Sequence, residues 1–402
     1  MEQIIFHIDV NSAFLSWTAV EELKNGATED IREIPAIIGG DREARHGIVL
    51  AKSVPAKRCG IVTGEPIVYA LRKCPDVKIY PANYKMYTER SEQLMAFLRT
   101  YTPDIEQVSV DECFMDFTGI AHKYESPKEA AYEIKDAVYK KFGYTVNVGI
   151  SVNHLLAKMA SDFEKPNKVH TLFLEEISSK MWPLPVSELY MAGRSSVEVL
   201  HKLEIRTIGE LAQADPNLLE LHLKSHGRTL WEFANGVDSS KVIRERVENK
   251  GIGNSTTMSK DVTTEEGAKE VLLRLAETVG GRLRKEKQKA GMVSVEIKYS
   301  TFQSVSHQTQ LPKATSTNQI IYQTACGLFK ELWNGEPIRL LGIRTSKLSE
   351  DSAPWQMSIF DFQEEQEEDK KRTEKQQKLD KALDEIRNKY GDTAIKRGTF
   401  LK

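Results

Sequence analysis

The hydrophobic and polar positions in the first part of the chain follow strand and helix periods in turn. An apolar run at Ile4–Ile8 predicts a buried strand, and the helical spacing after it predicts a helix over Ser12–Leu23. The further strands expected are Ile34–Gly40, Ile48–Lys52, Ile105–Val110, Cys113–Phe117 and Thr145–Ile150. The further helices expected are Tyr84–Arg99, Pro127–Lys141 and Asn153–Phe163. This β-α-β-β-α-β order predicts an α/β core with an insertion between about Lys24 and Tyr80.

The second half of the chain has a different pattern. Short helices with tight turns are predicted from Val186 to Gly236, then a polar tether, then an α+β unit from Gly251 to Leu348. Beyond Ser349 the residues are mostly charged or Gln, with too few large apolar side chains for a core. Four apolar residues there recur at helical spacing, which is compatible with a late helix that docks elsewhere: Leu379, Leu383, Ile386 and Tyr390. We interpret the tail beyond Gln363 as a solvated spacer in preference to a partner-binding helix.

The composition is that of a soluble protein with several domains. The chain has 402 residues, of which 40% are hydrophobic and 28% charged. The net charge of −2 conceals a basic stretch from Lys250 to Leu348, which has 15 Lys and Arg against 9 Asp and Glu. Its four cysteines form no CxxC pair, which argues against zinc and a disulfide framework and favours a reducing cytoplasm. We expect no signal peptide and no membrane span, since no apolar run approaches about 20 residues.

Three carboxylates in two separate segments are the candidate chemical groups. Asp9 closes the first apolar run, and Asp111 and Glu112 lie between two strand-like runs. A single acidic residue at such a place is usually part of a solvated turn or a helix N-cap. Carboxylates that neighbouring strands bring together, however, repel one another unless divalent cations lie between them. Two Mg²⁺ ions roughly 3.5–4 Å apart can hold the attacking and leaving oxygens of a phosphoryl transfer.

Three further residues fit a nucleotide site. Phe14 follows soon after Asp9, and an aromatic ring beside a bound nucleotide would leave no room for a ribose 2′-hydroxyl. Lys57 lies in a cationic segment after a strand, and Lys165 is held in a rigid position by Pro166. Both lysines would neutralise a polyphosphate. Taken singly, the phenylalanine also fits a hydrophobic core and the lysines also fit solvated turns.

Together these segments resemble the Y-family of DNA polymerases, the translesion enzymes, over about Ile4 to Leu348. The segments that match the family in order and spacing are Asp9-Val10-Asn11, Ser109-Val110-Asp111-Glu112, Val148-Gly149-Ile150-Ser151-Val152-Asn153, Ala157-Lys158-Met159-Ala160-Ser161 and Lys165-Pro166-Asn167. The resemblance implies a DNA-templated DNA polymerase that inserts nucleotides opposite damaged bases, with low fidelity and no proofreading.

The resemblance also implies a role for each site residue. The catalytic metal-binding groups would be Asp9, Asp111 and Glu112, with the Val10 carbonyl as an additional ligand of two Mg²⁺ ions. Phe14 would be the steric gate that excludes ribonucleotides. Lys57 and Lys165 would contact the triphosphate of the incoming dNTP.

Several positions depart from the family pattern. Family members often have Tyr-x-Ala-Arg where this chain reads Val54-Pro55-Ala56-Lys57, so a hydroxyl and the planar fork of Arg are both missing. Asn11 replaces a frequent second Asp, and Ala13 replaces a frequent aromatic residue beside the gate. These departures are more similar to the polymerase V catalytic-subunit branch than to polymerase IV.

The implied fold is an α+β multidomain right-hand polymerase. Its expected parts are a ferredoxin-like α/β palm (1–23 and 81–168), small fingers (24–80), a helical thumb (169–237), a linker (238–249), an α+β little finger (250–348) and a charged tail (349–402). In the thumb, Leu203–Leu211 resembles a helix-hairpin-helix, which would offer backbone N–H groups to DNA phosphates. The usual Gly-Ile-Gly turn is replaced by Ala192-Gly193-Arg194-Ser195. Helical packing without DNA contact is therefore the alternative for this segment. The basic little finger would hold duplex DNA through its backbone.

A short segment between the little finger and the tail resembles the pentapeptide by which bacterial polymerases bind the sliding clamp. Its residues are Gln356, Met357, Ser358, Ile359 and Phe360. An extended peptide with a Gln and spaced apolar anchors suits a preformed groove. The expected partners are therefore primer-template DNA, dNTP and the sliding clamp, with the chain acting as a monomer in the cytoplasm.

Two other functions stay open at this point. A catalytically idle adaptor between clamp and damaged DNA would have the same architecture, but it would need none of the three carboxylates. A different two-metal palm enzyme, such as a nucleotide cyclase, would use the carboxylates, but it would have no use for a basic domain or a clamp-like peptide. Primer extension with Mg²⁺ and dNTPs separates all three.

Overall fold

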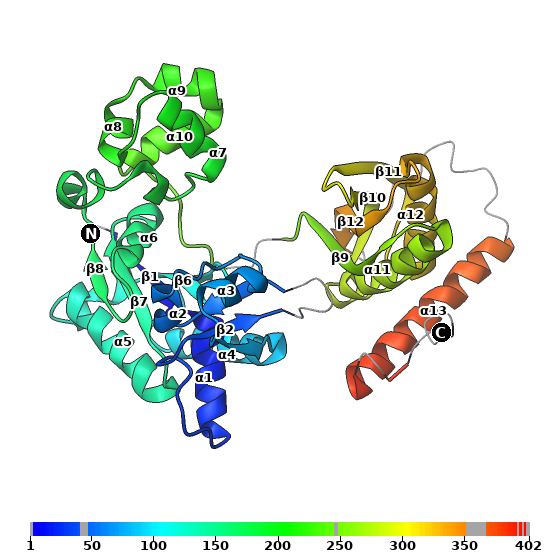
Figure 1. Ribbon diagram of the computed structural model, residues 1–402, viewed down its shortest axis with the longest axis horizontal. Helices are drawn as coiled ribbons and strands as arrows, with labels where there is room; N and C mark the ends of the chain where they lie inside the picture. Colours follow the sequence, from blue (N-terminus) through cyan, green and yellow to red (C-terminus); the bar gives the residue numbers. More distant parts are fainter. Residues whose placement is uncertain are drawn as a thin grey trace. The chain divides into compact units, whose positions relative to one another are not determined.

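The computed structural model of the chain describes residues 3–40, 47–244, 248–350, 367–391, 394–395 and 398. The protein folds as two compact units, one made of the described residues up to 244 and the other of those from 248 onward. Figure 1 shows the elements of each unit. Among the described residues, no helix is both long enough and apolar enough to cross a membrane.

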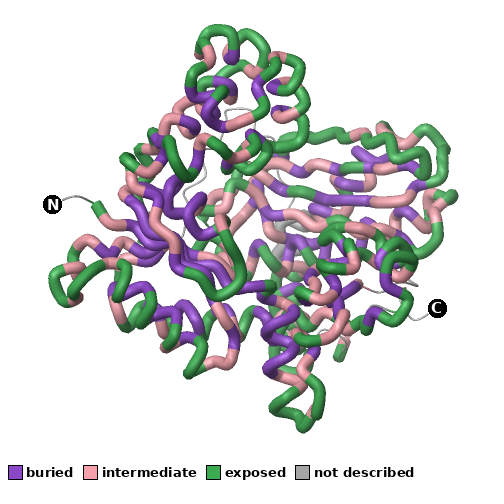
Figure 2. Tube along the Cα trace, turned by 60° about the vertical axis from the view of Figure 1, so that its left-hand side comes forward, coloured by how far each residue is buried: buried purple, intermediate pink, exposed green. Residues whose placement is uncertain are grey.

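A five-stranded sheet with the order β5-β6-β1-β7-β8 forms the centre of the first unit. Its strands are β1 (Ile5–Val10), β5 (Ile105–Gln107), β6 (Glu112–Asp116), β7 (Val146–Ser151) and β8 (Val169–Thr171). The central strand β1 pairs antiparallel with β6 and β7, and β8 runs parallel to β7. Every residue of β1 and β7 is buried, which is visible in Figure 2 and explains why both strands have few charged residues.

Helices cover both faces of this sheet. One face packs on α1 (Ala13–Lys24), α4 (Tyr84–Leu98) and α5 (Pro127–Phe142), and the other packs on α6 (His154–Asp162). Gly149 makes the second contact possible, because a Cβ atom there would lie 2.0 Å from the carbonyl oxygen of Ala157. Since side chains alternate along a strand, His7 and Asp9 of β1 share the face toward α6.

Two smaller parts of the first unit have cores of their own. The insertion predicted between about Lys24 and Tyr80 forms a small sheet with two short helices. Its elements are β2 (Ala36–Gly39), β3 (Val49–Lys52), β4 (Lys78–Pro81), α2 (Val54–Arg58) and α3 (Ile67–Lys73). After η1 (Thr118–Lys123) and β8 come the short elements η2 (Leu174–Glu176), η3 (Ile177–Met181), η4 (Val186–Glu188), α7 (Arg194–Lys202), α8 (Ile208–Gln213), α9 (Pro216–Leu223) and α10 (Ser225–Ala234). The domain borders expected from the sequence remain predictions.

The start of α8 has few free N–H groups for a phosphate. Ile208 and Gly209 donate to the carbonyls of Leu184 and Trp182, and Glu210 donates to the Thr207 hydroxyl. The start of α7 differs, because its N-cap is Gly193 and carries no side-chain cap.

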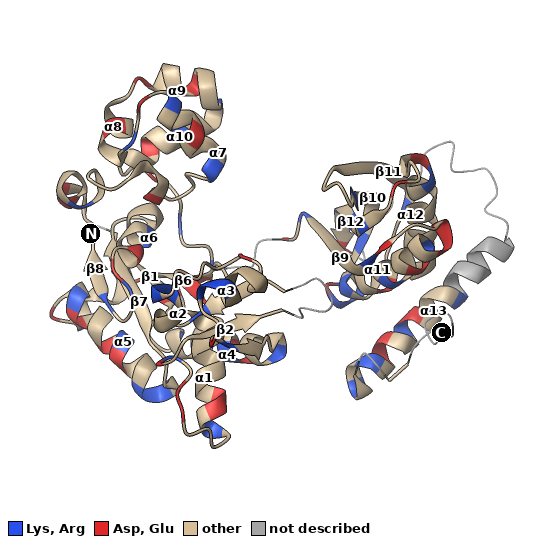
Figure 3. Cartoon of the chain, in the orientation of Figure 1, with Lys and Arg blue, Asp and Glu red and all other residues tan. Residues whose placement is uncertain are grey.

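The second unit is a four-stranded sheet with the order β11-β10-β12-β9. Its elements are β9 (Gly251–Val262), α11 (Glu265–Lys285), β10 (Gln288–Tyr299), β11 (Ser304–Thr315), α12 (Asn318–Leu332), β12 (Ile338–Glu350) and α13 (Glu367–Tyr390). Val293, Val295 and Ile297 of β10 are buried in the core that α11 and α12 share with the sheet. The alternate residues Ser294 and Glu296 line a hollow on the other face. Figure 3 colours the Lys and Arg positions of this unit blue and its Asp and Glu positions red.

Two predictions from the sequence are wrong. The strand expected over Ile105–Val110 ends at Gln107, because the chain turns there and the N–H groups of Val108 and Ser109 both donate to the Glu112 carbonyl. The tail interpreted as a spacer contains the long helix α13. That helix docks through charged residues, whereas Leu379, Ile386 and Tyr390 on its apolar side are exposed.

The docking of α13 depends on a buried polar network. Asp380 is fully buried, and it accepts hydrogen bonds from the backbone N–H and side-chain amide of Asn318 at 3.0 and 3.1 Å. It therefore caps α12, whose own N-cap residue Thr317 makes no side-chain cap. Arg284 binds both carboxylate oxygens of Asp384, at 2.5 and 2.9 Å.

Replacing Asp380 with alanine is expected to lower the free energy of unfolding by about 2 kcal/mol, since it removes a helix cap and leaves Arg284 and Asn318 short of partners. Thermal denaturation of the full chain measures this change. Glu385→Gln is the control, because it removes an exposed carboxylate from the same helix. If the two variants unfolded at the same temperature as the unmodified chain, the proposed capping would be wrong.

Candidate active site

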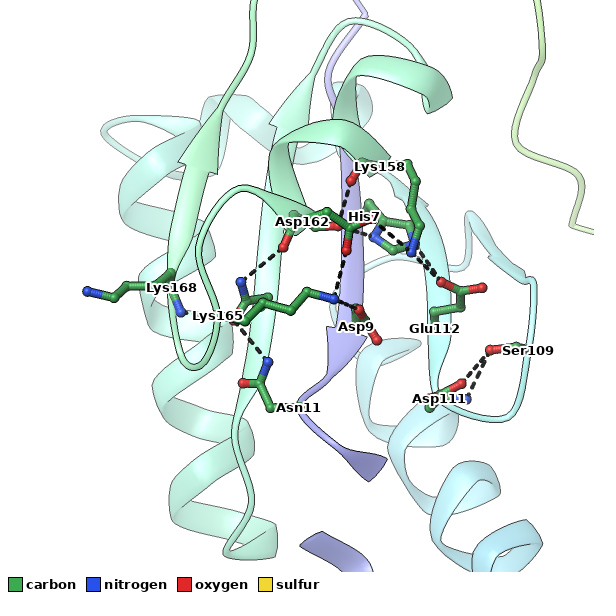
Figure 4. Close-up of polar contacts among 12 residues, drawn as sticks. His7, Asp9, Asn11, Ser109, Asp111, Glu112, Lys158, Asp162, Lys165 and Lys168 are labelled. Atoms are coloured by element: carbon green, nitrogen blue, oxygen red, sulfur yellow. Dashed lines mark hydrogen bonds and ion pairs between the residues drawn. The ribbon is translucent and has the colours of Figure 1, made fainter. Parts of the chain in front are cut away.

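Strand pairing brings the two acidic segments together at the carboxyl end of β1. Asp9 and Glu112 are direct partners in the β1–β6 ladder. The Val10 N–H donates to the Asp111 carbonyl at 3.0 Å, so Asp111, the residue before Glu112, is also held beside β1. Figure 4 shows the three carboxylates on these neighbouring segments. The two segments predicted from the sequence to form one site do lie side by side.

The turn before β6 positions Asp111. The Ser109 hydroxyl donates to Oδ1 of Asp111 at 2.6 Å. Burial raises the pKa of Asp111 the most; the Ser109 hydrogen bond opposes this, and the charges of Asp9 and Glu112 raise the pKa further. The raised pKa of Asp111 therefore reflects burial first, and repulsion from the two neighbouring carboxylates adds to it.

Glu112 is held between two basic side chains. Its Oε2 lies 2.8 Å from Nζ of Lys158 and 3.3 Å from Nε2 of the buried His7. Burial lowers the pKa of His7, so its ring faces Glu112 as a neutral imidazole, with Nδ1 2.8 Å from the Ser161 hydroxyl. The contacts with His7 and Lys158 lower the pKa of Glu112 to about 2 against the opposing effect of burial. Glu112 is therefore charged at neutral pH.

Asp9 is paired with Lys165 from the turn after α6. The Lys165 ammonium binds Oδ2 of Asp9, and it also binds Oδ1 of Asp162 at 2.7 Å. Burial acts to lower the pKa of Lys165, but Asp9 and Asp162 together raise it. The side chain of Asp9 is only 13% exposed, so this ion pair is partly shielded from water.

Two asparagines hold the turn that carries Lys165. Oδ1 of Asn11 accepts the Asn167 N–H at 2.9 Å, and its amide donates to Asn147 at 3.0 Å. The fully buried Asn147 donates in turn to the carbonyls of Ser161 and Glu164. Asn11 replaces a frequent acidic residue of the resembled family, and here it positions the backbone of the turn.

A pocket of about 410 Å³ opens beside the carboxylates. The central sheet and the Lys165 turn contribute Asp9, Val10, Asp111 and Lys165, and the insertion contributes Lys52, Lys57 and Thr63. Nζ of Lys52 donates to the Thr63 hydroxyl at 2.9 Å. Burial, followed by the neighbouring charge of Lys57, lowers the pKa of Lys52. Anionic groups thus lie at one side of the pocket and two ammonium groups at the other.

Phe14 lines the same pocket and is supported from behind by aromatic rings. Its ring stacks on Tyr87, with centroids 4.3 Å apart and planes 7° apart. Tyr87 is 1% exposed, and its hydroxyl lies 3.0 Å from the Thr18 hydroxyl. Tyr84 meets the Phe14 ring edge-on at 6.1 Å. The phenylalanine that the sequence suggested as a gate is therefore a rigid part of the pocket wall.

The donor atoms suit a hard divalent cation, but the side chains are not arranged around one. Among the described residues, no three His, Cys, Asp or Glu side chains converge as a finished metal site. Asp9 and Glu112 face lysines instead. Carboxylate oxygens and a backbone carbonyl are the ligands that Mg²⁺ prefers. The residues fit the ion once the lysines release them.

Sequence reasoning missed several residues of the site. His7 could have been found because Asp9 follows it by two positions on the same strand, so both side chains lie on the same face of the sheet. Tyr87 could have been found by its helical spacing from Tyr84 on α4. Asp162 and Asn147 gave no comparable signal, since their contacts depend on how α6 packs on β7. The proposed clamp residues Gln356–Phe360 lie outside the described part of the chain.

Comparisons with known proteins show the family to which the chain is similar. A family model described as the impB/mucB/samB family matches residues 8–162, and the C-terminal domain model of that family matches residues 249–359. The DNA polymerase IV of Clostridium acetobutylicum is 48% identical over 100% of this chain and 99% of its own. The DNA polymerase IV 1 of Bacillus subtilis is 35% identical over 100% of this chain and 94% of its own.

A solved structure resembles the chain in fold. A Y-family DNA polymerase chimera covers 86% of this chain and 99% of its own, with a TM-score of 0.74 and 20% identity. The two relatives carry the name polymerase IV, whereas the departures in the sequence had been compared with the polymerase V branch.

Proposed function

We propose a two-metal mechanism for this chain, which belongs to the Y-family of DNA polymerases. The chain is a DNA-directed DNA polymerase of the translesion type, and its substrates are a DNA template and nucleotides. The observation that supports the mechanism best is the direct pairing of Asp9 with Glu112 beside Asp111, at the edge of a pocket lined by lysines.

The three carboxylates would serve as the metal-binding groups, with the Val10 carbonyl as a further ligand. When bound, two Mg²⁺ ions would stabilise charge on the attacking primer oxygen and on the leaving pyrophosphate. Glu112 is kept ionised by His7 and Lys158, so it is ready to accept a cation without losing a proton first. Asp111 is free of lysine contacts among the described residues, with Ser109 fixing its carboxylate.

The lysines that line the pocket would hold the triphosphate. Lys57 and Lys165 are the contacts expected from the family resemblance, and Lys52 lines the same pocket beside Thr63. An ammonium group neutralises phosphate without the fixed two-pronged geometry of a guanidinium. Phosphate binding in this pocket therefore depends on several point charges, in place of the arginine frequent in the family.

Primer extension is the direct test. The unmodified chain with Mg²⁺ and dNTPs is expected to extend a primer on an intact template and on one with a damaged base. An adaptor would bind the DNA without extension, and a nucleotide cyclase would consume nucleotide without a primer. Either result would contradict the proposed function.

We further propose that Gln356–Phe360 binds the sliding clamp and that the chain works as a monomer in the cytoplasm. Deleting these five residues is expected to remove the stimulation of synthesis by the clamp while leaving synthesis without clamp unchanged, because none of the residues proposed for the polymerase reaction belongs to this peptide. Extension with and without clamp measures this. Equal stimulation of the full and shortened chains would contradict the assignment.

A further inference from the structure

Five charged side chains of alternating sign connect the two metal-binding ends of the site. We name this set the ion-pair chain: Glu112, Lys158, Asp162, Lys165 and Asp9. Figure 4 shows it running from β6 across α6 and back to β1. Asp162, the last residue of α6, lies at its middle, 2.7 Å from Nζ of Lys165 and 3.6 Å from Nζ of Lys158.

The two lysines stand where cations would otherwise neutralise the carboxylates. Lys165 binds Asp9 and Lys158 binds Glu112, so both metal-binding side chains are already paired with positive charge. A divalent cation must compete with Lys165 for Asp9, since both seek the same carboxylate. The incoming triphosphate attracts Lys165 in the opposite direction. The site therefore works only if Lys165 can leave Asp9 without becoming an unpaired, partly buried charge.

Asp162 supplies the second partner that this exchange requires. It contacts Lys165 at 2.7 Å while Lys165 also binds Asp9, so the ammonium can release Asp9 and keep one carboxylate. Asp162 is the more exposed acid, with 44% of its side chain accessible against 13% for Asp9. It does not itself line the pocket, and neither the family resemblance nor the three catalytic carboxylates give it a role.

We propose that Asp162 is a positioning residue for both cation and nucleotide binding. It draws Lys165 away from Asp9, which opens Asp9 to the metal, and it keeps the ammonium beside the pocket for the phosphates. Its other contact holds Lys158 in place beside Glu112. This inference rests on the proposed two-metal function, and it assigns to Asp162 the control of how readily the cation displaces lysine.

Asp162→Asn tests the proposal. The neutral amide attracts the Lys165 ammonium less strongly than a carboxylate does, so the lysine stays on Asp9, and one negative charge near the cation site is lost. We expect the dissociation constant for Mn²⁺ to rise about three- to tenfold, the size expected for one partly exposed charge. Electron paramagnetic resonance of free Mn²⁺ measures this with a dideoxy-terminated primer, so no turnover is involved. The KM for dNTP should rise by a similar factor while kcat stays within about twofold.

Two further variants separate positioning from general effects. Glu164→Gln is the matched control, since it removes a carboxylate two residues away that pairs with Lys168 and touches neither lysine of the ion-pair chain. Asp162→Glu keeps the charge and should restore most of the Mn²⁺ affinity. Unchanged Mn²⁺ binding in Asp162→Asn, an equal loss in Glu164→Gln, or a fall in kcat at constant KM would each overturn the proposal. Primer extension by the unmodified chain in the same assay tests the polymerase function separately.

Discussion

Replacement of Asp111 by alanine is expected to lower primer extension by roughly a thousandfold or more, because the site loses a carboxylate that would hold the cations proposed to stabilise the charge of the transition state. Asp9→Ala should have an effect of similar size, since Asp9 pairs directly with Glu112 across β1 and β6. Single-nucleotide insertion on a primer-template measures both variants.

Binding of the primer-template should change little in these variants, because the basic second unit is untouched. Asp136→Ala is the control, since that carboxylate lies on the surface of α5 with 70% of its side chain exposed. Extension by Asp111→Ala at the rate of this control would exclude Asp111 from the reaction.

Replacement of Phe14 by alanine is expected to let the enzyme insert ribonucleotides. The ring occupies the pocket wall and is fixed by its stack on Tyr87, so it cannot move aside for a 2′-hydroxyl. Removing it should reduce the preference for dNTP over NTP by about 10- to 200-fold, the usual range for one steric contact in a pocket. The ratio of kcat/KM for dATP and ATP measures the change.

A matched aromatic substitution controls for loss of packing. Phe97 is a partly buried ring on α4 that meets Tyr101 and Phe142 outside the pocket. Phe97→Ala should leave sugar preference as in the unmodified enzyme. The gate assignment fails if the two variants discriminate equally well.

The sequence predicted the position of the carboxylates because their signals are local. Asp9 follows a run of buried residues, and Asp111-Glu112 falls where two strand-like runs meet, so strand pairing alone brings them together. Phe14 follows in the same way from its place at the start of α1. Lys57 and Lys165 were suggested by their local sequence and by the family resemblance together, and both line the pocket beside Asp9.

The sequence did not predict the ion pairs that charged side chains form between the carboxylates and the lysines of the site. The ion-pair chain forms only because α6 lies close to β7, and the absence of a side chain at Gly149 permits this close packing. The hydrophobic pattern of the sequence does not predict the distance between a helix and a strand. The contacts of Asp162 and Asn147 follow only from the packed structure.

In the tail, the pattern of apolar residues predicted the helix but not the face by which the helix docks. Its apolar residues at helical spacing did indicate a helix, but α13 docks by the face that carries Asp380 and Asp384. Leu379 and Ile386 stay exposed. Apolar spacing gave the element correctly, whereas the docking face was set by Arg284 on α11 and by the hydrogen-bond donors of Asn318 at the start of α12.

A crystal structure of the enzyme with a dideoxy-terminated primer-template, dNTP and Mn²⁺ tests the central claim most directly. Anomalous scattering should reveal two ions bound by Asp9, Asp111 and Glu112, with Lys165 moved from Asp9 to the triphosphate. Bound nucleotide with no ion at these carboxylates, or with the ions held by other residues, would contradict the account.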